Sequence, residues 1–283
     1  MNTKTARISL IFVVIMVLAV FVVVSKPDIQ NRMTSVFMFD VGQGDSFLIQ
    51  ASNGKQMLID GGKDATVLSE LSRAMPWGDK SIDIVLATHP DMDHVGGLDE
   101  VLKRYKVGMF LTSEVGGETE EYKNLLALVN KKKIPAYVVQ QGMKLDLSEK
   151  EYFLVLFPDR DVRGWETNTG SVVGKFVSGK RSVLFTGDSP TSIEQYLSAT
   201  ISKDLDVDIL KLGHHGSRTS TTAVYLKATT PSLALISAGK NNSYGHPHKE
   251  VLTLLKQFSV PFVSTQESGT TTFKTDGMRW YKK

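Results

Sequence analysis

The sequence predicts a mixed α/β (α+β) fold in which two β-sheets pack face to face and helices cover them from outside. The first predicted strands follow one another across short polar turns, as in a β-meander. Later strands alternate with segments of helical spacing, and that mixture favours two packed sheets flanked by helices. The chain has 283 residues and 41% apolar content, and no repeat or linker interrupts it after about residue 34. We therefore expect one large domain, residues 28–283, behind an N-terminal segment.

The N-terminal segment, residues 1–27, contains an unbroken apolar run at residues 8–24, preceded by Lys4 and Arg7. As a helix this run would reach about 25 Å, near the lower limit for crossing a bilayer. We expect one N-terminal hydrophobic helix that anchors the chain in the cell membrane. The basic flank should stay inside, which leaves the domain outside after a single pass. The alternative is a signal peptide cleaved after the apolar run, which would give a secreted protein.

Composition limits the chemistry that the domain can perform. The chain has no Cys, so any metal ion must be held by His and carboxylate side chains. The formal charge of +3 at pH 7 comes from Lys4, Arg7 and Lys26, because residues 28–283 contain equal numbers of basic and acidic residues. Proteins that grip long nucleic acid normally carry a basic excess. Net charge therefore gives no support for a nucleic-acid-binding domain.

Apolar, β-prone runs mark the expected strands, and polar turns or Pro separate them from segments of helical spacing. In the first half we expect strands at residues 36–40, 47–50, 56–60, 82–88, 107–111, 136–140, 143–147 and 152–157. Helices are expected there at residues 64–74, 98–105 and 119–132. After an irregular charged stretch, a second set of strands is expected at residues 171–177, 182–186, 207–212, 233–237, 262–265 and 270–274. Helices between them are expected at residues 191–198, 220–227 and 249–258.

Acidic residues occur in the turns of the opening meander. The VGQGDS loop lacks the third glycine of a dinucleotide fingerprint, so we expect no nucleotide cofactor. We expect this tight loop instead to bring Asp40 and Asp45 towards the active face. Asp60 ends the third strand in LIDGG, where it is either a turn-forming residue or the orienting partner of a metal-binding loop.

The most informative stretch is HPDMDHVGG, residues 89–97, which lies between a predicted strand and a predicted helix. It offers two imidazoles and two carboxylates within six positions: His89, Asp91, Asp93 and His94. Carboxylates this close repel one another unless a cation lies between them. A loop held by a strand before it and a glycine-opened helix behind it is also a usual setting for metal ligands. The stretch predicts a metal site, against the alternative of a polar surface turn.

Further candidate ligands follow later strands. The six His residues form three pairs, at positions 89 and 94, 214 and 215, and 246 and 248. Asp188 follows the β-prone run in VLFTGDS, and His214 and His215 follow VDILKLG. Both groups repeat the arrangement of the central motif, an acid or imidazole at the C-terminal end of a strand. We expect these groups to converge on one site.

These motifs together resemble a known family. HPDMDH is similar to the HxHxDH signature of the metallo-β-lactamase fold, with Asp91 in place of the middle His. FDVGQGDSFLI, LIDGG, NTGSVV, LFTGDS, KLGHHGSRTST, ISAGKNN and GHPH resemble the extracellular metallo-β-lactamase-like domain of the ComEC type, found in bacterial competence proteins that form DNA-uptake channels. The resemblance covers about residues 34–275. It implies a four-layer αββα sandwich with a metal centre at one edge of its two sheets.

The resemblance also implies two divalent metal ions, zinc or manganese. Their ligands would be His89 and Asp91 for one ion, Asp93 and His94 for the other, Asp188 as a bridge, and His214 completing the second site. His215 is the less favoured member of its pair, although the sequence does not decide between them. Asn168 stands where many relatives place a third His for the first site. With Asp91, this makes the first site richer in oxygen, which predicts weaker zinc binding or a preference for manganese.

The expected function is hydrolysis of a phosphodiester, with DNA suggested by the resemblance. Paired cations would lower the pKa of a shared water towards neutrality and hold the resulting metal-bound hydroxide in line with a bound ester. Asp93 would orient or deprotonate that water. Asn168, His246 or His248 would stabilise charge on the phosphoryl oxygens, and Lys249 beside His248 suits an anionic substrate. The sequence thus predicts a metal-dependent phosphodiesterase or nuclease that acts outside the cytoplasmic membrane.

Two alternatives stay open. One is an envelope phosphoesterase that acts on teichoic-acid or choline-phosphate groups. The other is a non-catalytic module that binds DNA or a partner with a degenerate metal site. A channel role is not carried over from the family, because this chain has one apolar span instead of many. The sequence leaves the oligomeric state open.

Overall fold

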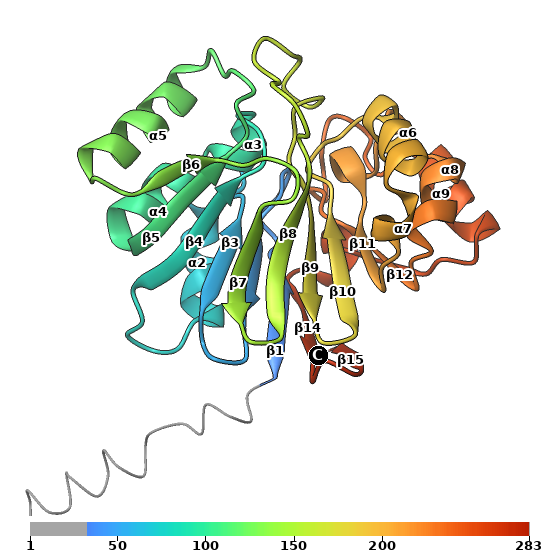
Figure 1. Cartoon of the computed structure of the whole chain (residues 1–283), viewed down its shortest axis with the longest axis horizontal. Coiled ribbons are helices and arrows are strands. Elements are labelled where there is room, and N and C mark those ends of the chain that lie inside the picture. Colours follow the sequence, from blue (N-terminus) through green and yellow to red (C-terminus); the bar gives the residue numbers. More distant parts are fainter. Residues whose placement is uncertain (1–32, 283) are drawn as a thin grey trace, which may run out of the picture. The chain divides into compact units, whose positions relative to one another are not determined.

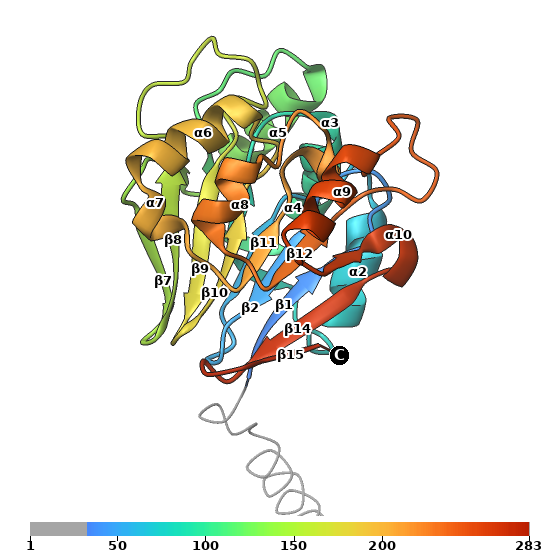
Figure 2. The same cartoon turned by 90° about the vertical axis from the view of Figure 1, so that its right-hand side faces the viewer.

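Two mixed β-sheets lie face to face in the computed structural model, which describes residues 33–282, and helices cover the outer face of each sheet (Figures 1 and 2). The layers run helices, sheet, sheet, helices. This is the four-layer αββα arrangement that the sequence predicts, so the expected fold class is confirmed.

The first sheet has eight strands in the order β15-β14-β1-β2-β3-β4-β5-β6. The opening three strands are antiparallel neighbours, as in the predicted meander, and β3 to β6 are parallel. The strands are β1 (Thr34–Met38), β2 (Phe47–Gln50), β3 (Gln56–Ile59), β4 (Ser81–Ala87), β5 (Lys106–Thr112), β6 (Ala136–Val138), β14 (Thr271–Thr275) and β15 (Trp280–Lys282). The helices on its outer side are α2 (Thr66–Ala74), α4 (Leu98–Arg104) and α5 (Glu120–Lys131), with the short α3 (Met92–Val95) between β4 and α4.

The second sheet has seven strands in the order β13-β12-β11-β10-β9-β8-β7. They are β7 (Lys144–Ser148), β8 (Glu151–Phe157), β9 (Val173–Ser178), β10 (Arg181–Phe185), β11 (Ile209–Lys211), β12 (Leu233–Ile236) and β13 (Phe262–Ser264). The helices are α6 (Thr191–Thr200), α7 (Ser202–Leu205), α8 (Ala223–Thr229), α9 (Lys249–Gln257) and α10 (Thr265–Ser268), with a 3-10 turn, η2 (Gly213–Gly216). Figure 2 shows α6, α8 and α9 over the outer face of this sheet.

The main core lies between the two sheets. Side chains of successive strand residues point to opposite faces, so alternate residues enter this layer. Val36 and Met38 of β1 are fully buried there, and the rings of Phe47 and Phe185, one from each sheet, pack edge to face 5.3 Å apart. The outward-facing alternates are covered by the helices, which form a second and a third apolar cluster. Both sheets are therefore rigid supports for the loops at their edges.

The two sets of strands expected along the chain do not correspond to the two sheets. The hairpin of β7 and β8 precedes the charged stretch and belongs to the second sheet. Strand β14 joins the first sheet, where Met38 of β1 pairs with Thr271. Strand partners are chosen by packing between segments far apart in the sequence, which local patterns do not report.

The predicted anchor or signal peptide at residues 1–27, with its membrane contact through residues 8–24, lies outside the described residues. Within residues 33–282, none of the helices combines the length and the apolar character needed to cross a membrane.

The parallel strands point the functional loops to one edge. Strands β3, β4 and β5 of the first sheet run parallel, and so do β10, β11 and β12 of the second. The carboxyl ends of neighbouring parallel strands lie at the same edge of a sheet, where ligands commonly bind. The loops that follow β4, β10 and β11 carry His94, Asp188 and His215, and these three side chains meet.

Candidate metal centre

Loops from both sheets build one buried polar cluster. Asp45 comes from the β1–β2 loop, His94 follows β4, Asp188 follows β10 and His215 follows β11. One ligand atom from each of these four lies within 4.8 Å of the others, and all four residues are buried. Buried acids and imidazoles this close need a cation or shared protons. The cluster is therefore a metal-binding constellation that uses only the ligand types available to a chain without Cys.

The first-sheet loops are joined by their backbones. Asp45 N donates to Asp93 O at 3.1 Å, Gly62 N donates to Asp45 O at 2.8 Å, and Gly61 N donates to His94 O at 2.7 Å. A Cβ added at Gly97 would lie 2.2 Å from the carbonyl oxygen of Gly61, so only glycine permits this approach. The glycines of LIDGG and HVGG thus allow three loops to hold the central motif in place.

Each imidazole of the centre is oriented through its Nδ1 atom. His94 Nδ1 lies 2.8 Å from Asp60 Oδ2, and His215 Nδ1 lies 2.9 Å from the carbonyl oxygen of Ser237. His89 Nδ1 lies 3.0 Å from Thr88 Oγ1. Partners of this kind fix the tautomer of the ring and leave the lone pair of Nε2 free to bind a metal ion.

The Nε2 atoms face carboxylates. His94 Nε2 is 3.3 Å from Asp188 Oδ1, and His215 Nε2 is 3.3 Å from Asp188 Oδ2 and 3.2 Å from Asp93 Oδ2. Within the described residues, the buried atoms His89 Nε2, His94 Nε2 and Asp188 Oδ1 have no hydrogen-bond partner. Such orphaned groups are rare in folded proteins and need a ligand or ion to explain them. The donor set of imidazole nitrogens and carboxylate oxygens fits a divalent cation.

The pKa shifts within the metal-free cluster also indicate a site that requires positive charge. Burial alone would lower the pKa of His94 and His215, but the neighbouring carboxylates, Asp188 above all, raise both well above the ordinary value. Burial would raise the pKa of Asp188, yet His215 and His94 hold it well below its usual range. Protons therefore supply the compensating positive charge when no cation does. A bound cation displaces them.

Asp45 and Lys211 form an ion pair behind the rings. Lys211, at the end of β11, is only 1% exposed, pairs with Asp45 Oδ2 and donates to Gly187 O at 2.7 Å. Asp45 Oδ1 lies 3.3 Å from the Nδ1 atom of His215, the side of the ring away from Asp93. Asp45 belongs to the cluster by distance. Because Asp45 lies on the Nδ1 side of the His215 ring, it is better placed to hold that ring and Lys211 than to bind a cation at the Nε2 atoms.

The adjacent His214 and His215 occupy different positions. His215 is 1% exposed and lies inside the cluster, whereas the His214 side chain is 29% exposed and its Nε2 is 3.9 Å from Asp188 Oδ2. Both residues have left-handed backbone conformations, with φ of 47° and 56°. Such conformations cost about 1–3 kcal/mol each in non-glycine residues and concentrate at functional sites. The structure thus places His215 inside the buried cluster and His214 at its margin, whereas the resemblance favours His214 as the ligand.

The expected first metal site is more open. Asp91 Oδ2 is 3.7 Å from His89 Nε2, and the Asp91 side chain is 39% exposed. Burial is the main cause that raises the pKa of Asp91, and a hydrogen bond with Thr167 acts against it. The neighbouring Asn168 has a buried Oδ1 atom that finds no partner among residues 33–282. Asp91 and Asn168 would therefore contribute oxygen atoms as ligands at this site.

The last His pair forms the rim of the centre. The ring centroid of His246 is 5.4 Å from that of His214, 6.1 Å from that of His215 and 4.9 Å from that of His248. Burial lowers the pKa of His246 to about 4, with His215 adding to the effect. His248 Nδ1 accepts a hydrogen bond from Arg218 N at 3.1 Å. His246 is therefore nearer the cluster than His248 and is neutral.

Three site features were absent from the sequence analysis. Lys211 carries a signal in the sequence, since it is a lone cation within the apolar run VDILKLG. Ser237 acts through its carbonyl oxygen, and Thr88 through a hydroxyl beside the central motif.

Asp40, which we expected near the active face, is part-exposed. Its carboxylate accepts a hydrogen bond from Gly42 N, and its own N–H donates to Thr270 Oγ1. Among residues 33–282, Asp40 makes no hydrogen bond or ion pair with the members of the cluster.

Comparisons with known proteins bear on the whole domain. The family model of the metallo-beta-lactamase superfamily matches residues 39–240. ComE operon protein 3 of Bacillus subtilis is 30% identical over 261 residues, which cover 84% of this chain and 33% of that protein. Recombination protein 2 of Haemophilus influenzae is 31% identical over 250 residues, covering 87% and 29%. Competence protein ComA of Neisseria gonorrhoeae is 28% identical over 279 residues, covering 95% and 37%. The chain thus spans about a third of the length of these curated relatives.

Solved structures share the fold at low sequence identity. CmlA, a diiron beta-hydroxylase from Streptomyces venezuelae, superposes with a TM-score of 0.56 at 14% identity over 86% of this chain and 54% of its own. Zinc-bound PqqB from Methylobacterium extorquens gives a TM-score of 0.52 at 10% identity, over 81% and 87%. At these identities the likeness shows the fold alone.

Proposed function

This chain belongs to the metallo-β-lactamase superfamily, and from that premise we propose that it is a metal-dependent phosphodiesterase that hydrolyses DNA or a similar phosphodiester outside the cytoplasmic membrane. The observation that carries the proposal is the convergence of two imidazoles and two carboxylates: His94 Nε2 and His215 Nε2 each lie 3.3 Å from an oxygen of Asp188, and His215 Nε2 lies 3.2 Å from Asp93 Oδ2. That arrangement suits a divalent cation, and no Ser, Thr or Cys side chain is among these four groups.

The residues of the centre would have different roles. His89, His94, Asp93, Asp188 and His215 would hold the metal, as one ion or as two. When bound, divalent metal ions lower the pKa of a water molecule and polarise a phosphoryl oxygen. Asp93 has a second role, because its side chain is 29% exposed and can orient that water or accept its proton.

A phosphodiester is supported by the rim. Neutral His246 and the amide of Asn168 can donate hydrogen bonds to phosphoryl oxygens without carrying a fixed charge. Lys249, the first residue of α9, follows His248 in the sequence and adds a positive charge there. The relatives named for competence and recombination support DNA as the polymer. The apolar run at residues 8–24 supports anchoring at the membrane, with the domain on the outer side.

The test is metal-dependent turnover by the full chain. The protein is stripped with chelator, reloaded with manganese or zinc, and incubated with bis(p-nitrophenyl) phosphate, single-stranded DNA or poly(glycerol phosphate). We expect turnover that requires metal and that Asp93→Asn and Asp188→Asn abolish, while the exposed Asp146→Asn control keeps it. Metal-independent turnover, or full activity of both variants, would contradict the proposal. Turnover of poly(glycerol phosphate) alone identifies an envelope phosphoesterase, and DNA binding without any turnover identifies a non-catalytic module.

A further inference from the structure

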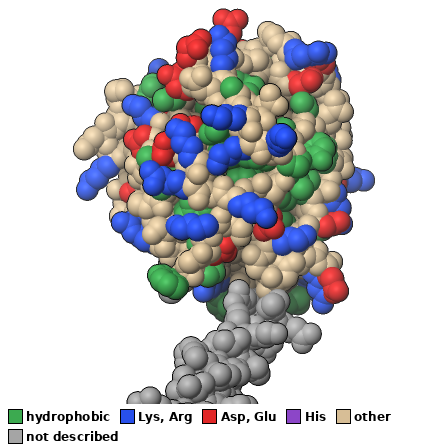
Figure 3. Space-filling view, turned by 90° about the vertical axis from the view of Figure 1, so that its left-hand side faces the viewer, with side chains coloured by type: hydrophobic (Ala, Val, Ile, Leu, Met, Phe, Trp, Pro, Cys, Tyr) green, Lys and Arg blue, Asp and Glu red, His purple; other side chains and the backbone are tan. Residues whose placement is uncertain are grey.

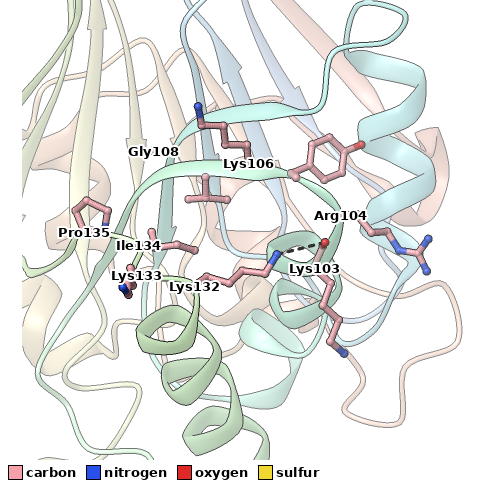
Figure 4. Close-up of a pocket in the computed structure, with 10 residues that line it drawn as sticks. Lys103, Arg104, Lys106, Gly108, Lys132, Lys133, Ile134 and Pro135 are labelled. Carbon is pink, nitrogen blue, oxygen red and sulfur yellow. Dashed lines mark hydrogen bonds between the residues drawn. The ribbon is translucent and has the colours of Figure 1, made fainter.

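Basic side chains gather on the face of the molecule that α4 and α5 cover (Figure 3). The C-terminal ends of these two helices and the start of β5 surround a hollow of about 680 Å³ there, drawn in Figure 4. Five of the residues that line it are basic: Lys103, Arg104, Lys106, Lys132 and Lys133. We call this hollow the basic pocket. The equal numbers of acids and bases in residues 28–283 make such a concentration of one sign a local feature.

The charges of the basic pocket are only partly neutralised. Lys103 Nζ pairs with Asp99 and Glu100 at 2.8 Å, and Arg104 pairs with Glu100 at 3.2 Å. Within the part of the chain that the structure describes, Lys106 and Lys133 have no acidic partner, and both are exposed. Two ammonium groups are thus available to an anion.

Lys132 and the floor give the pocket a defined shape. Lys132 Nζ donates to the carbonyl oxygens of Leu102 and Lys103, the latter at 3.3 Å, so its charge is held inside the hollow (Figure 4). Val107 and Ile134 lie buried beneath it. A hollow with a fixed interior charge and two free ammonium groups suits a phosphate group on a strand. A flat lipid surface would meet the protruding side chains and leave the hollow unfilled.

We propose that the basic pocket binds the phosphate backbone of a polymeric phosphodiester while another part of the same strand lies at the metal centre. This inference rests on the proposed function, and it adds a second binding site that selects long substrates. The pocket carries no candidate ligand or general base, so its contribution is to affinity and not to chemistry.

The fold sets the spacing between the two sites. Lys106 begins β5 and lies beside the first residues of β4, whereas His89 follows the end of β4. Eight residue steps, from Ser81 beside Lys106 to His89, at about 3.3 Å each separate the two positions by roughly 26 Å. A helical strand covers that span with on the order of eight nucleotides at about 3.4 Å each. Short substrates therefore reach only one site at a time.

The experiment measures binding without catalysis. Fluorescence anisotropy follows a labelled 30-nucleotide single strand titrated with the full chain in chelator, at several salt concentrations. For Lys106→Glu/Lys133→Glu we expect binding weaker by at least about tenfold and a salt slope smaller by about 1.4, since each contact to a single strand contributes about 0.7. Binding of a labelled dinucleotide should not change. The matched control is Lys227→Glu/Lys256→Glu, which reverses two exposed charges on α8 and α9.

The outcomes separate this proposal from the one on which it rests. Equal loss in the control pair would overturn the basic pocket as a specific site. So would binding of phosphatidylglycerol vesicles that depends on Lys106 and Lys133 while the oligonucleotide is not bound. Turnover of bis(p-nitrophenyl) phosphate by the Lys106→Glu/Lys133→Glu protein reports on the proposed function alone, and we expect it to equal that of the parent chain.

Discussion

Asp60 Oδ2 lies 2.8 Å from His94 Nδ1, on the side of the ring opposite to the atom that faces Asp188. The carboxylate also accepts hydrogen bonds from Thr88 N and Thr88 Oγ1, both at 2.8 Å. Asp60 is 1% exposed and has a left-handed backbone with φ of 58°. It therefore ties the strand end, the central motif and the ring orientation together, which is the orienting role considered for it in the sequence.

We predict that Asp60→Asn lowers metal affinity by about 10–100-fold, the usual cost of losing a partner that orients a metal-bound His. Asn tolerates the left-handed conformation, so the thermal midpoint of the metal-free protein should change little. Titration calorimetry with manganese or zinc measures the affinity, and Asp64→Asn, on the exposed side of the same loop, is the control. Unchanged affinity in Asp60→Asn would mean that the ring is oriented by other contacts.

The adjacent His residues should differ sharply when each is replaced by Asn, which suits their left-handed backbone. We predict that His215→Asn lowers metal affinity by more than about a hundredfold, above the cost of a lost orienting partner. His214→Asn should retain most of the metal, because its ring lies at the margin. Metal content after gel filtration measures both variants. The reverse order of loss would restore the ligand assignment expected from the resemblance.

The buried pair of Lys211 and Asp45 predicts non-additive stability changes. Lys211→Met alone leaves Asp45 buried without its cation and should cost about 3–5 kcal/mol of unfolding free energy. Asp45→Asn/Lys211→Met removes both charges and should recover much of that loss. Urea denaturation of the metal-free protein measures the cycle. Lys175→Met, on β9 of the same sheet, is the control, and additive effects of the two site substitutions would show that the pair is not coupled.

Glu194 predicts a pH dependence of stability. Its carboxylate, 1% exposed on α6, accepts hydrogen bonds from Thr221 N at 2.6 Å and Thr222 N at 2.8 Å. Burial raises the pKa of Glu194 from 4.5 to about 7. A raised pKa in the folded state means that the contribution is complete below pH 4.5 and is lost as the pH rises through 7.

We therefore expect the stability of the parent chain, measured against Glu194→Gln, to fall by roughly 2 to 3 kcal/mol between pH 5 and pH 8. Urea denaturation in chelator at both pH values gives the difference. Glu267→Gln, an exposed acid, should show no such change. If the unfolding free energy of the parent chain instead rose relative to that of Glu194→Gln between pH 5 and pH 8, the argument would be refuted.

Asn168 and Asp91 predict the metal preference. With these oxygen donors beside His89, the first site should favour manganese over zinc more than a site with three imidazoles does. We predict that Asn168→His raises the ratio of zinc to manganese affinity by roughly tenfold or more. Competition titration with both ions measures the ratio, and Asn130→His, on the exposed side of α5, controls for an added imidazole. An unchanged or lower ratio of zinc to manganese affinity in Asn168→His would contradict the hypothesis.

Much of the architecture was predictable from local patterns. The period of apolar residues and the positions of turn residues placed most helices and strands to within a few residues, because these signals depend on near neighbours. The same reasoning put His89, Asp93, His94 and Asp188 at strand ends. The glycine-rich loops around Asp45 and Asp60 were also visible, since close backbone approaches need glycine.

Only the tertiary structure decided which of these groups meet. Asp93 and His215 are 122 residues apart, and their side chains lie 3.2 Å from each other. The same kind of distant contact pairs Lys211 with Asp45 and brings the ends of α4 and α5 together around the basic pocket. A sequence specifies local conformation through neighbouring residues, whereas the choice between His214 and His215 depends on how two sheets pack. That packing is a property of the whole folded chain.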